Sequence, residues 1–74
     1  MPNNILSQLV DELPPLIART EVGRLTGGLI SPRTMANLDS KKLGPSKLKF
    51  GRKVAYEREA FINFLAERLV ADSA

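Results

Sequence analysis

The sequence predicts a small, mainly α-helical domain that carries one two-stranded antiparallel β-hairpin. Apolar residues recur at helical spacing in several segments, and proline or glycine residues separate these segments from one another. One later segment instead alternates apolar and basic residues around a glycine, which is typical of a hairpin. With 74 residues and no cysteine, the chain has to build one core without disulfides.

Residues 1–13 are expected to form an N-terminal helical extension to a domain of residues 14–74. The apolar residues of this extension repeat at helical spacing; they are Ile5, Leu6, Leu9, Val10 and Leu13. Asn3 or Asn4 can cap the helix, and two consecutive prolines end it because proline lacks a backbone N–H. The helix can either pack onto the domain or mediate dimerisation, and we expect packing.

A short second helix is expected over residues 21–26. Thr20 precedes it and can act as its N-cap, and an acidic residue occupies the first turn, where the helix dipole favours negative charge. Gly27 and Gly28 follow it and are expected to end it.

The third helix has the clearest start signal in the chain. Ser31 supplies an N-cap hydroxyl, and Pro32 follows at the first helical position, where its missing N–H has no effect. The helix is expected to run to about Ser40, with Met35 and Leu38 on its inner side.

The segment SKLKFGRKVAY, residues 46–56, is expected to form the hairpin. If one face of both strands is buried, Phe50 lies opposite Val54 and Leu48 opposite Tyr56, because a slip of one residue would turn a lysine into the core. This register leaves a three-residue Gly-Arg-Lys loop, whereas a two-residue Gly-Arg loop would set Phe50 against a lysine. All four apolar side chains are assigned to the core, and the Tyr56 hydroxyl is expected to reach the surface.

The last helix closes the domain. Its apolar stripe consists of Phe61, Ile62, Phe64, Leu65 and Leu69. The element order is therefore helix, helix, helix, two-stranded hairpin, helix. Two short helices that precede a basic hairpin and a closing helix are the outline of a winged helix-turn-helix domain.

Positive charge is concentrated in one part of the chain. From Arg33 to Lys53 there are seven basic residues and one acid, Asp39, which is a local charge of +6, whereas the rest of the chain carries −3. Such a segment attracts polyanions, although a lysine-rich stretch on its own can also be a solvated face. Asp39 is expected to pair with a nearby lysine or to end the third helix.

Three ordered motifs carry a family resemblance: EVGRL, SPRTMANLDSKKLGP and KLKFGRKVAYEREAFINFL. Over residues 16–69 the chain resembles the excisionase and AlpA-type phage regulators, a helix-turn-helix group related to the MerR-type winged domain. The resemblance implies sequence-specific binding of double-stranded DNA. The protein would act either as an excisionase, a recombination directionality factor that self-associates on DNA and assists an integrase, or as a transcriptional regulator of a mobile element.

The resemblance also implies which residues contact DNA, because in such domains the helix after the turn enters the major groove and the hairpin follows the backbone or the minor groove. The candidates are Arg33, Thr34, Asn37 and Lys41 on the third helix and Lys47, Lys49, Arg52 and Lys53 on the hairpin. Arginine can bond guanine edges and asparagine adenine edges. In the alternative interpretation, Arg33 and Asn37 are ordinary exposed residues and Thr34 bonds back within its helix.

Other classes of function find little support in the sequence. There is no histidine, cysteine or glycine-rich phosphate loop, so we expect no catalysis, cofactor or metal. No apolar run approaches the ~20 residues that span a bilayer, and the N-terminus lacks a basic signal region, so we expect a cytoplasmic protein without membrane contact. The alternative function is a protein-interaction module that uses the N-terminal apolar helix and the basic face.

Overall fold

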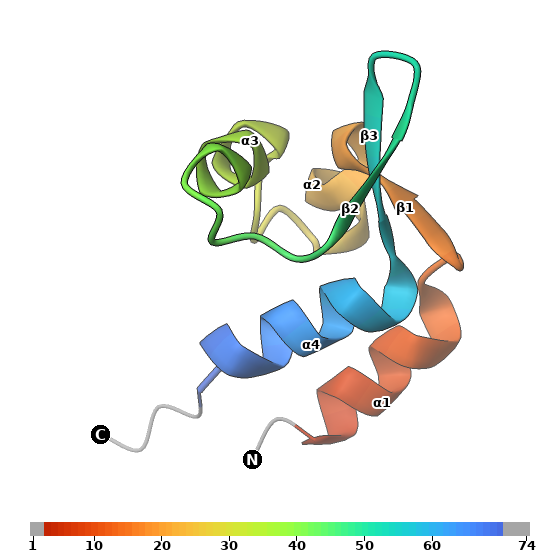
Figure 1. The fold of residues 1–74 in the computed structure, drawn as a ribbon. Coiled ribbons are helices and arrows are strands. Elements are labelled where there is room, and N and C mark those ends of the chain that lie inside the picture. The colour runs from red at the N-terminus through yellow and green to blue at the C-terminus, as the bar shows by residue number, and fades with distance from the viewer. Residues whose placement is uncertain (1–2, 71–74) are drawn as a thin grey trace.

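The computed structural model describes residues 3–70, with side chains from residue 5 onwards, and consists of helices around a three-stranded antiparallel sheet (Figure 1). Its elements are α1 (Asn3–Glu12), β1 (Leu16–Ala18), the 3-10 helix η1 (Arg19–Glu21), α2 (Val22–Leu25), α3 (Pro32–Ser40), β2 (Lys47–Phe50), β3 (Lys53–Glu57) and α4 (Arg58–Arg68). The mainly α-helical class with a small antiparallel sheet is confirmed. No described helix has both the length and the apolar character needed to cross a membrane.

Helix α1 packs against α4, and the two lie side by side in Figure 1. Leu13, just after α1, is buried in the core, and Leu6 and Leu9 pack against it. Ile5 and Val10 stay about half exposed. The expected packing of this segment onto the rest of the chain is therefore observed, whereas its expected asparagine cap lies outside the described side chains.

The core draws one or more side chains from most elements. Five of these side chains are completely buried: Ile17, Val22, Met35, Tyr56 and Phe61. Helix α4 adds Ile62, Phe64 and Leu65 from the stripe that the spacing predicts, with Leu69 partly buried. The sequence period thus identifies the buried face of α4 correctly.

The caps of α2 and α3 differ in outcome. Thr20 does not cap α2, because it lies inside η1 and the helix begins at Val22 without a side-chain cap. The glycines after α2 do adopt positive φ angles, 65° at Gly27 and 87° at Gly28, as a helix-ending role requires. At α3, the Ser31 hydroxyl accepts a hydrogen bond from the backbone N–H of Thr34 at 3.1 Å, which confirms the predicted cap.

The sheet contains a strand that the sequence pattern does not reveal. Strand β1 pairs with β3, which places β3 in the centre of the order β1-β3-β2. Three residues are too few to display an alternating pattern, so β1 has no periodic signal. Its pairing sets Ile17 opposite Tyr56 on the face that the helices cover.

The predicted register of the hairpin is wrong. Phe50 lies opposite Lys53 and Leu48 opposite Ala55, and Gly51 and Arg52 form a two-residue turn. Gly51 has a φ of 64°, which suits the first position of the tight turns that match strand twist. The geometry of the two-residue turn therefore sets the register, although the expected pairing of Phe50 with Val54 and of Leu48 with Tyr56 would have buried more apolar side chains.

The corrected register reverses the faces of β2. Lys49 now shares a face with Val54, and the apolar side chains of β2 point outwards, with Leu48 48% and Phe50 85% exposed. The assignment of these two to the core is therefore wrong, whereas Val54 is partly buried and Tyr56 fully buried. The reason is the register, which places Lys47 and Lys49 on the inner face of β2 and leaves its two apolar side chains on the outer face.

Candidate nucleic-acid interface

Helix α3 carries an exposed polar stripe on the side away from the core. Arg33 and Asn37 are exposed and lie one helical turn apart, and Lys41 follows directly after the last turn. Met35 faces inwards and is fully buried. The cap at Ser31 and this anchor hold the stripe in a fixed orientation.

Thr34 lies on a different flank of α3 from that stripe. It is exposed, but with Leu38 it lines an apolar hollow between α3 and α4. Its hydroxyl lies 3.0 Å from the hydroxyl of Ser31, so the alternative of a bond back to its own helix backbone is not observed. The structure thus separates Thr34 from the other α3 candidates.

The hairpin and α3 enclose a second hollow, of about 330 Å³, which we call the basic hollow. The residues that line it are Arg19, Ala36, Asp39, Ser40, Lys47, Lys49, Arg52 and Val54. The register of β2 is the reason that Lys47 and Lys49 face this space, since the predicted pairing would have turned them away from the core side. Lys53 lies on the opposite face of the sheet, directly across from Phe50.

The sequence interpretation did not identify Ala36, Ser40 or Arg19 as part of this surface. Ala36 and Ser40 are four residues apart and therefore lie on one face of α3, so the helical period predicts their place on this surface once the hairpin is known to lie beside that face. Arg19 has no local signal, because 20 residues separate it from Asp39 in the chain.

Seven cations of the basic segment make no ion pair within residues 3–70; they are Arg33, Lys41, Lys42, Lys47, Lys49, Arg52 and Lys53. The one acid of that segment, Asp39, is instead bound by Arg19, whose guanidinium nitrogen Nη2 lies 2.6 Å from the carboxylate. Asp39 therefore does not pair with a lysine, contrary to expectation. The positive charge of α3 and the hairpin stays available to an external polyanion.

Asp39 is the centre of a buried network that connects three elements. The hydroxyl of Tyr56 donates to Asp39 Oδ2 at 2.6 Å, and Arg19 Nε donates to the same hydroxyl at 3.1 Å. The sequence-based expectation that the Tyr56 hydroxyl reaches the surface is therefore wrong, because the whole side chain is buried and its hydroxyl bonds within this network. Because the three residues belong to η1, α3 and β3, the network fixes α3 relative to the hairpin.

Burial raises the pKa of the Tyr56 hydroxyl from about 10 to about 12. The folded state therefore holds this proton more tightly than the unfolded chain does. The resulting stability is complete below pH 10 and is lost as the pH rises towards 12. Since the chain has one tyrosine, the absorbance of the phenolate reports on this group alone.

We expect the phenolate of the native protein to form near pH 12, or together with alkaline unfolding, and that of the denatured protein near pH 10. A native titration that already reaches its midpoint near pH 10 would show that the hydroxyl is not buried in this network.

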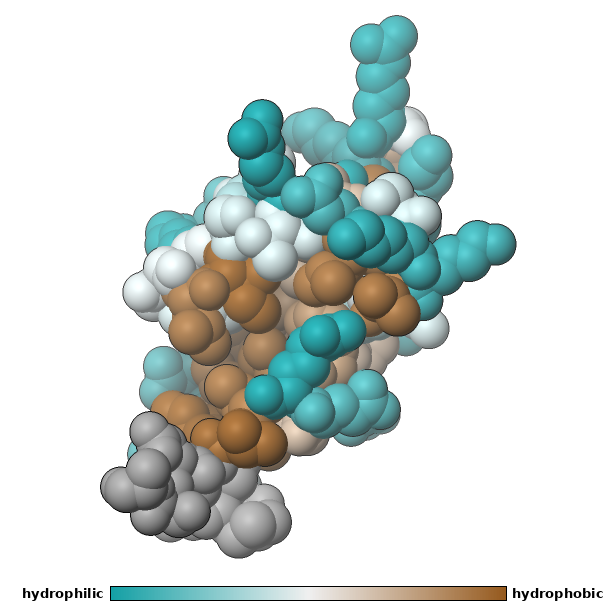
Figure 2. Space-filling view, turned by 90° about the vertical axis from the view of Figure 1, so that its left-hand side faces the viewer, coloured by the Kyte–Doolittle hydropathy of each residue, from teal (hydrophilic) through white to brown (hydrophobic). Residues whose placement is uncertain are grey.

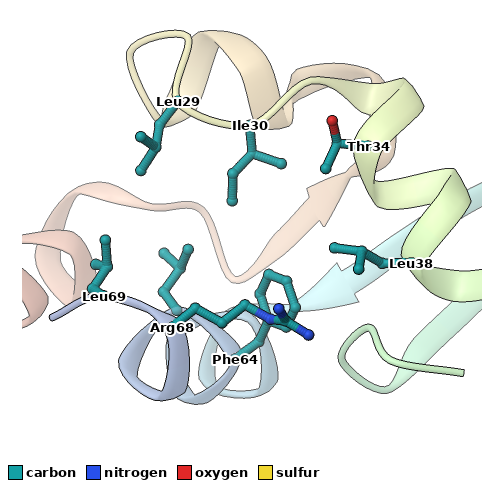
Figure 3. A pocket seen from close by; sticks show the side chains of 8 residues that line it. Leu29, Ile30, Thr34, Leu38, Phe64, Arg68 and Leu69 are labelled. Carbon is teal, nitrogen blue, oxygen red and sulfur yellow. The ribbon is translucent and has the colours of Figure 1, made fainter.

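A separate apolar groove lies on another face of the molecule. Its first part, about 360 Å³, is lined by Leu29, Ile30, Thr34, Leu38, Phe64, Leu65, Arg68 and Leu69. Figure 3 shows Leu29 and Ile30 pointing across this space towards the side chains of Phe64, Arg68 and Leu69, and Leu38 entering it from α3. A second part of similar size continues towards α1, and Figure 2 shows the hydrophobic side chains gathered on this face.

No protein-family model matches this sequence, and searches of curated proteins and of solved structures give no match either. Within residues 3–70, no cluster of three or more acidic, histidine or cysteine side chains could hold a metal ion. The resemblance to the excisionase and AlpA-type regulators rests on the sequence motifs and stays a prediction.

Proposed function

We propose that this protein binds double-stranded DNA in a sequence-specific manner as a small winged helix-turn-helix protein. Helix α3 would enter the major groove, and the β2–β3 hairpin would act as the wing against the backbone or minor groove. The observation that supports this most strongly is the basic hollow, where α3 and three hairpin cations face one space. The one acid that lines this hollow, Asp39, is already paired with Arg19.

The exposed stripe of α3 has the chemistry that base recognition needs. Arg33 can bond O6 and N7 of guanine in a bidentate manner, and Asn37 can do the same with N6 and N7 of adenine. Lys41 and the hairpin cations would contact phosphates, which provides affinity and orientation but no direct sequence information. Thr34 is the weakest candidate, since it lies on the flank of α3 that faces the apolar groove.

The biological role that we propose follows from the family resemblance. The protein would serve as an excisionase that self-associates on neighbouring sites and assists an integrase, or as a transcriptional regulator of a mobile element. Both roles use the same DNA-binding surface. Bound sequences that map to an attachment site would support the first role, and sequences upstream of a promoter would support the second.

Selection of bound sequences from random duplexes tests the proposal, and we expect it to enrich a defined site. Replacing Asn37 with alanine is expected to relax preference at one base pair by about 1–3 kcal/mol, because one bidentate contact is lost. Binding to unrelated duplexes should stay nearly unchanged. Binding assays on the selected site and its single-base variants measure this discrimination.

Asn63→Ala is the matched control, since it removes the same side chain from an exposed position on α4. The control should keep the wild-type preference. Equal binding to every duplex by the wild-type protein, or an unchanged preference after Asn37→Ala, contradicts base recognition by α3. Absence of binding at low salt would rule out the DNA-binding function itself.

The apolar groove supports a second candidate function, a protein-interaction module. This groove lies between α1, α4 and the segment before α3, and exposed Leu29 borders both of its parts. Docking there would use the apolar side chains of α1 that stay exposed, together with the basic face. Salt separates the two functions, because DNA binding through phosphates weakens steeply with ionic strength, whereas the part of the docking that the apolar groove provides persists at high salt.

A further inference from the structure

Phe50 is the most exposed large apolar side chain among the described residues, at 85%. It ends β2, and the turn at Gly51 follows it directly. Leu48 lies on the same outer face of the sheet but is two residues further from the turn, roughly 7 Å along the strand. The phenyl ring of Phe50 therefore lies closer to the tip of the hairpin than the side chain of Leu48 does.

Cations lie beside this phenyl ring on both faces of the hairpin tip. Lys53 shares the outer face with Phe50 and lies directly opposite it across the strand pair, and Arg52 forms half of the turn. Lys49, next to Phe50 in β2, points to the other face and lines the basic hollow. None of these cations makes an ion pair within residues 3–70. A partner that buries Phe50 has to bring negative charge close to its apolar contact surface, because otherwise the cations beside the ring would lose water without compensation.

Nucleic acid offers this combination of an apolar contact surface and nearby negative charge, because each flat base is attached to a backbone of phosphates. Aromatic side chains stack on exposed bases, and apolar side chains inserted between base pairs kink the duplex. The turn also leaves space for a close approach: a Cβ atom placed on Gly51 would meet no other atom within 4 Å. The hairpin tip is thus narrow, cationic and apolar on one side.

We propose that Phe50 is a wedge residue that stacks on a base at a step opened by the hairpin tip, and that this insertion bends the duplex. The inference rests on the proposed DNA-binding function and adds to it a mode of contact. Arg52 and Lys53 would hold the flanking phosphates, and Phe50 would supply stacking energy that does not depend on charge.

Three variants test this mode: Phe50→Ala, Phe50→Trp and Leu48→Ala. Their affinities are measured for the duplex that the selection enriches and for its single strand. A 2-aminopurine base in the duplex reports unstacking, and energy transfer between dyes at its ends reports bending. Phe50 is largely exposed and Leu48 about half exposed, so we expect all three variants to keep a melting temperature close to that of the wild type, which circular dichroism checks.

Phe50→Ala is expected to weaken duplex binding roughly five- to a hundredfold, from the loss of one stacked base. It should abolish the fluorescence increase and the bend and leave the salt dependence unchanged, because no cation is removed. Phe50→Trp should keep both signals, and Leu48→Ala should behave like the wild type.

Several results overturn the inference. If the wild type binds the duplex and Phe50→Ala binds it equally well without a change in fluorescence, the wedge is wrong while DNA binding stands. An equal loss of duplex affinity from Leu48→Ala would mean that the outer face of β2 contacts DNA as a whole and that Phe50 is not a wedge at the tip. A Phe50-dependent preference for the single strand over the duplex would replace the wedge by single-strand stacking, and absence of any nucleic-acid binding would remove the proposed function as well.

Discussion

Replacing Asp39 with alanine is expected to lower the free energy of unfolding by about 2–4 kcal/mol. The change removes the acceptor for the buried Tyr56 hydroxyl and the partner of Arg19 together. Removing one member of a buried charged pair is costly because the other member stays behind without compensation. The Arg19 side chain is 25% exposed and can regain some hydration, so we expect the lower part of the usual range.

A loss of this size is large for a domain of 74 residues, whose total stability is about 4–11 kcal/mol. The melting temperature should fall by roughly 10–25 °C. Thermal and denaturant unfolding followed by circular dichroism measure both quantities. Tyr56→Phe removes two hydrogen bonds, the one that the hydroxyl donates to Asp39 and the one that it accepts from Arg19, but it keeps the ring and the ion pair. It should cost about 1–3 kcal/mol.

Asp11→Ala is the matched control for Asp39→Ala, since it removes an exposed carboxylate of α1. It should leave the unfolding midpoint within about 0.5 kcal/mol of the wild type. If Asp39→Ala is as stable as this control, the network does not hold α3 against the sheet.

Replacing Lys47, Lys49 and Arg52 with alanine together is expected to weaken DNA binding about a hundredfold at physiological salt, for all sequences alike. All three side chains line the basic hollow and are exposed. Each cation that neutralises a phosphate releases counterions, so the slope of log K against log salt should become shallower by roughly 0.9 per residue. Titration of labelled duplex at several salt concentrations measures affinity and slope together.

Arg52→Ala and Arg24→Ala form a matched pair within this experiment. Arg24 is exposed on α2 and paired with Glu21, away from the hollow. Arg52→Ala should lower the slope and Arg24→Ala should not. An equal effect of both would mean that net charge, rather than the arrangement of α3 and the hairpin, drives the interaction.

These expectations depend on features that differ in how visible they are in the sequence. The start of α3 is a local signal, since the Ser31 hydroxyl and the proline after it act within one turn, and its predicted bounds agree with the structure. The buried stripe of α4 is also local, because a period of three and four residues identifies one face of a helix. The exposure of Arg33 and Asn37 follows from the same period.

The hairpin shows where such reasoning fails. Parity along residues 47–56 identifies the inner face of β3, because Val54 and Tyr56 do point inwards. The same parity misplaces Leu48 and Phe50, because an alternating pattern does not tell whether any core lies beneath the second strand. The glycine turn sets the register instead, and this register turns both side chains to the outer face of the sheet.

Local sequence patterns are enough to predict the four α-helices within residues 3–70, the breaks between them, the concentration of positive charge on α3 and the hairpin, and the inner face of β3. These properties depend on neighbours within a few residues, so local spacing and capping chemistry reveal them. Three features appear only in the folded chain: Arg19, Asp39 and Tyr56 form one network, Lys47 and Lys49 face α3, and Phe50 is exposed beside the turn. These contacts join residues far apart in the chain, and they exist only once β1 has paired with β3 and the helices have closed over that sheet.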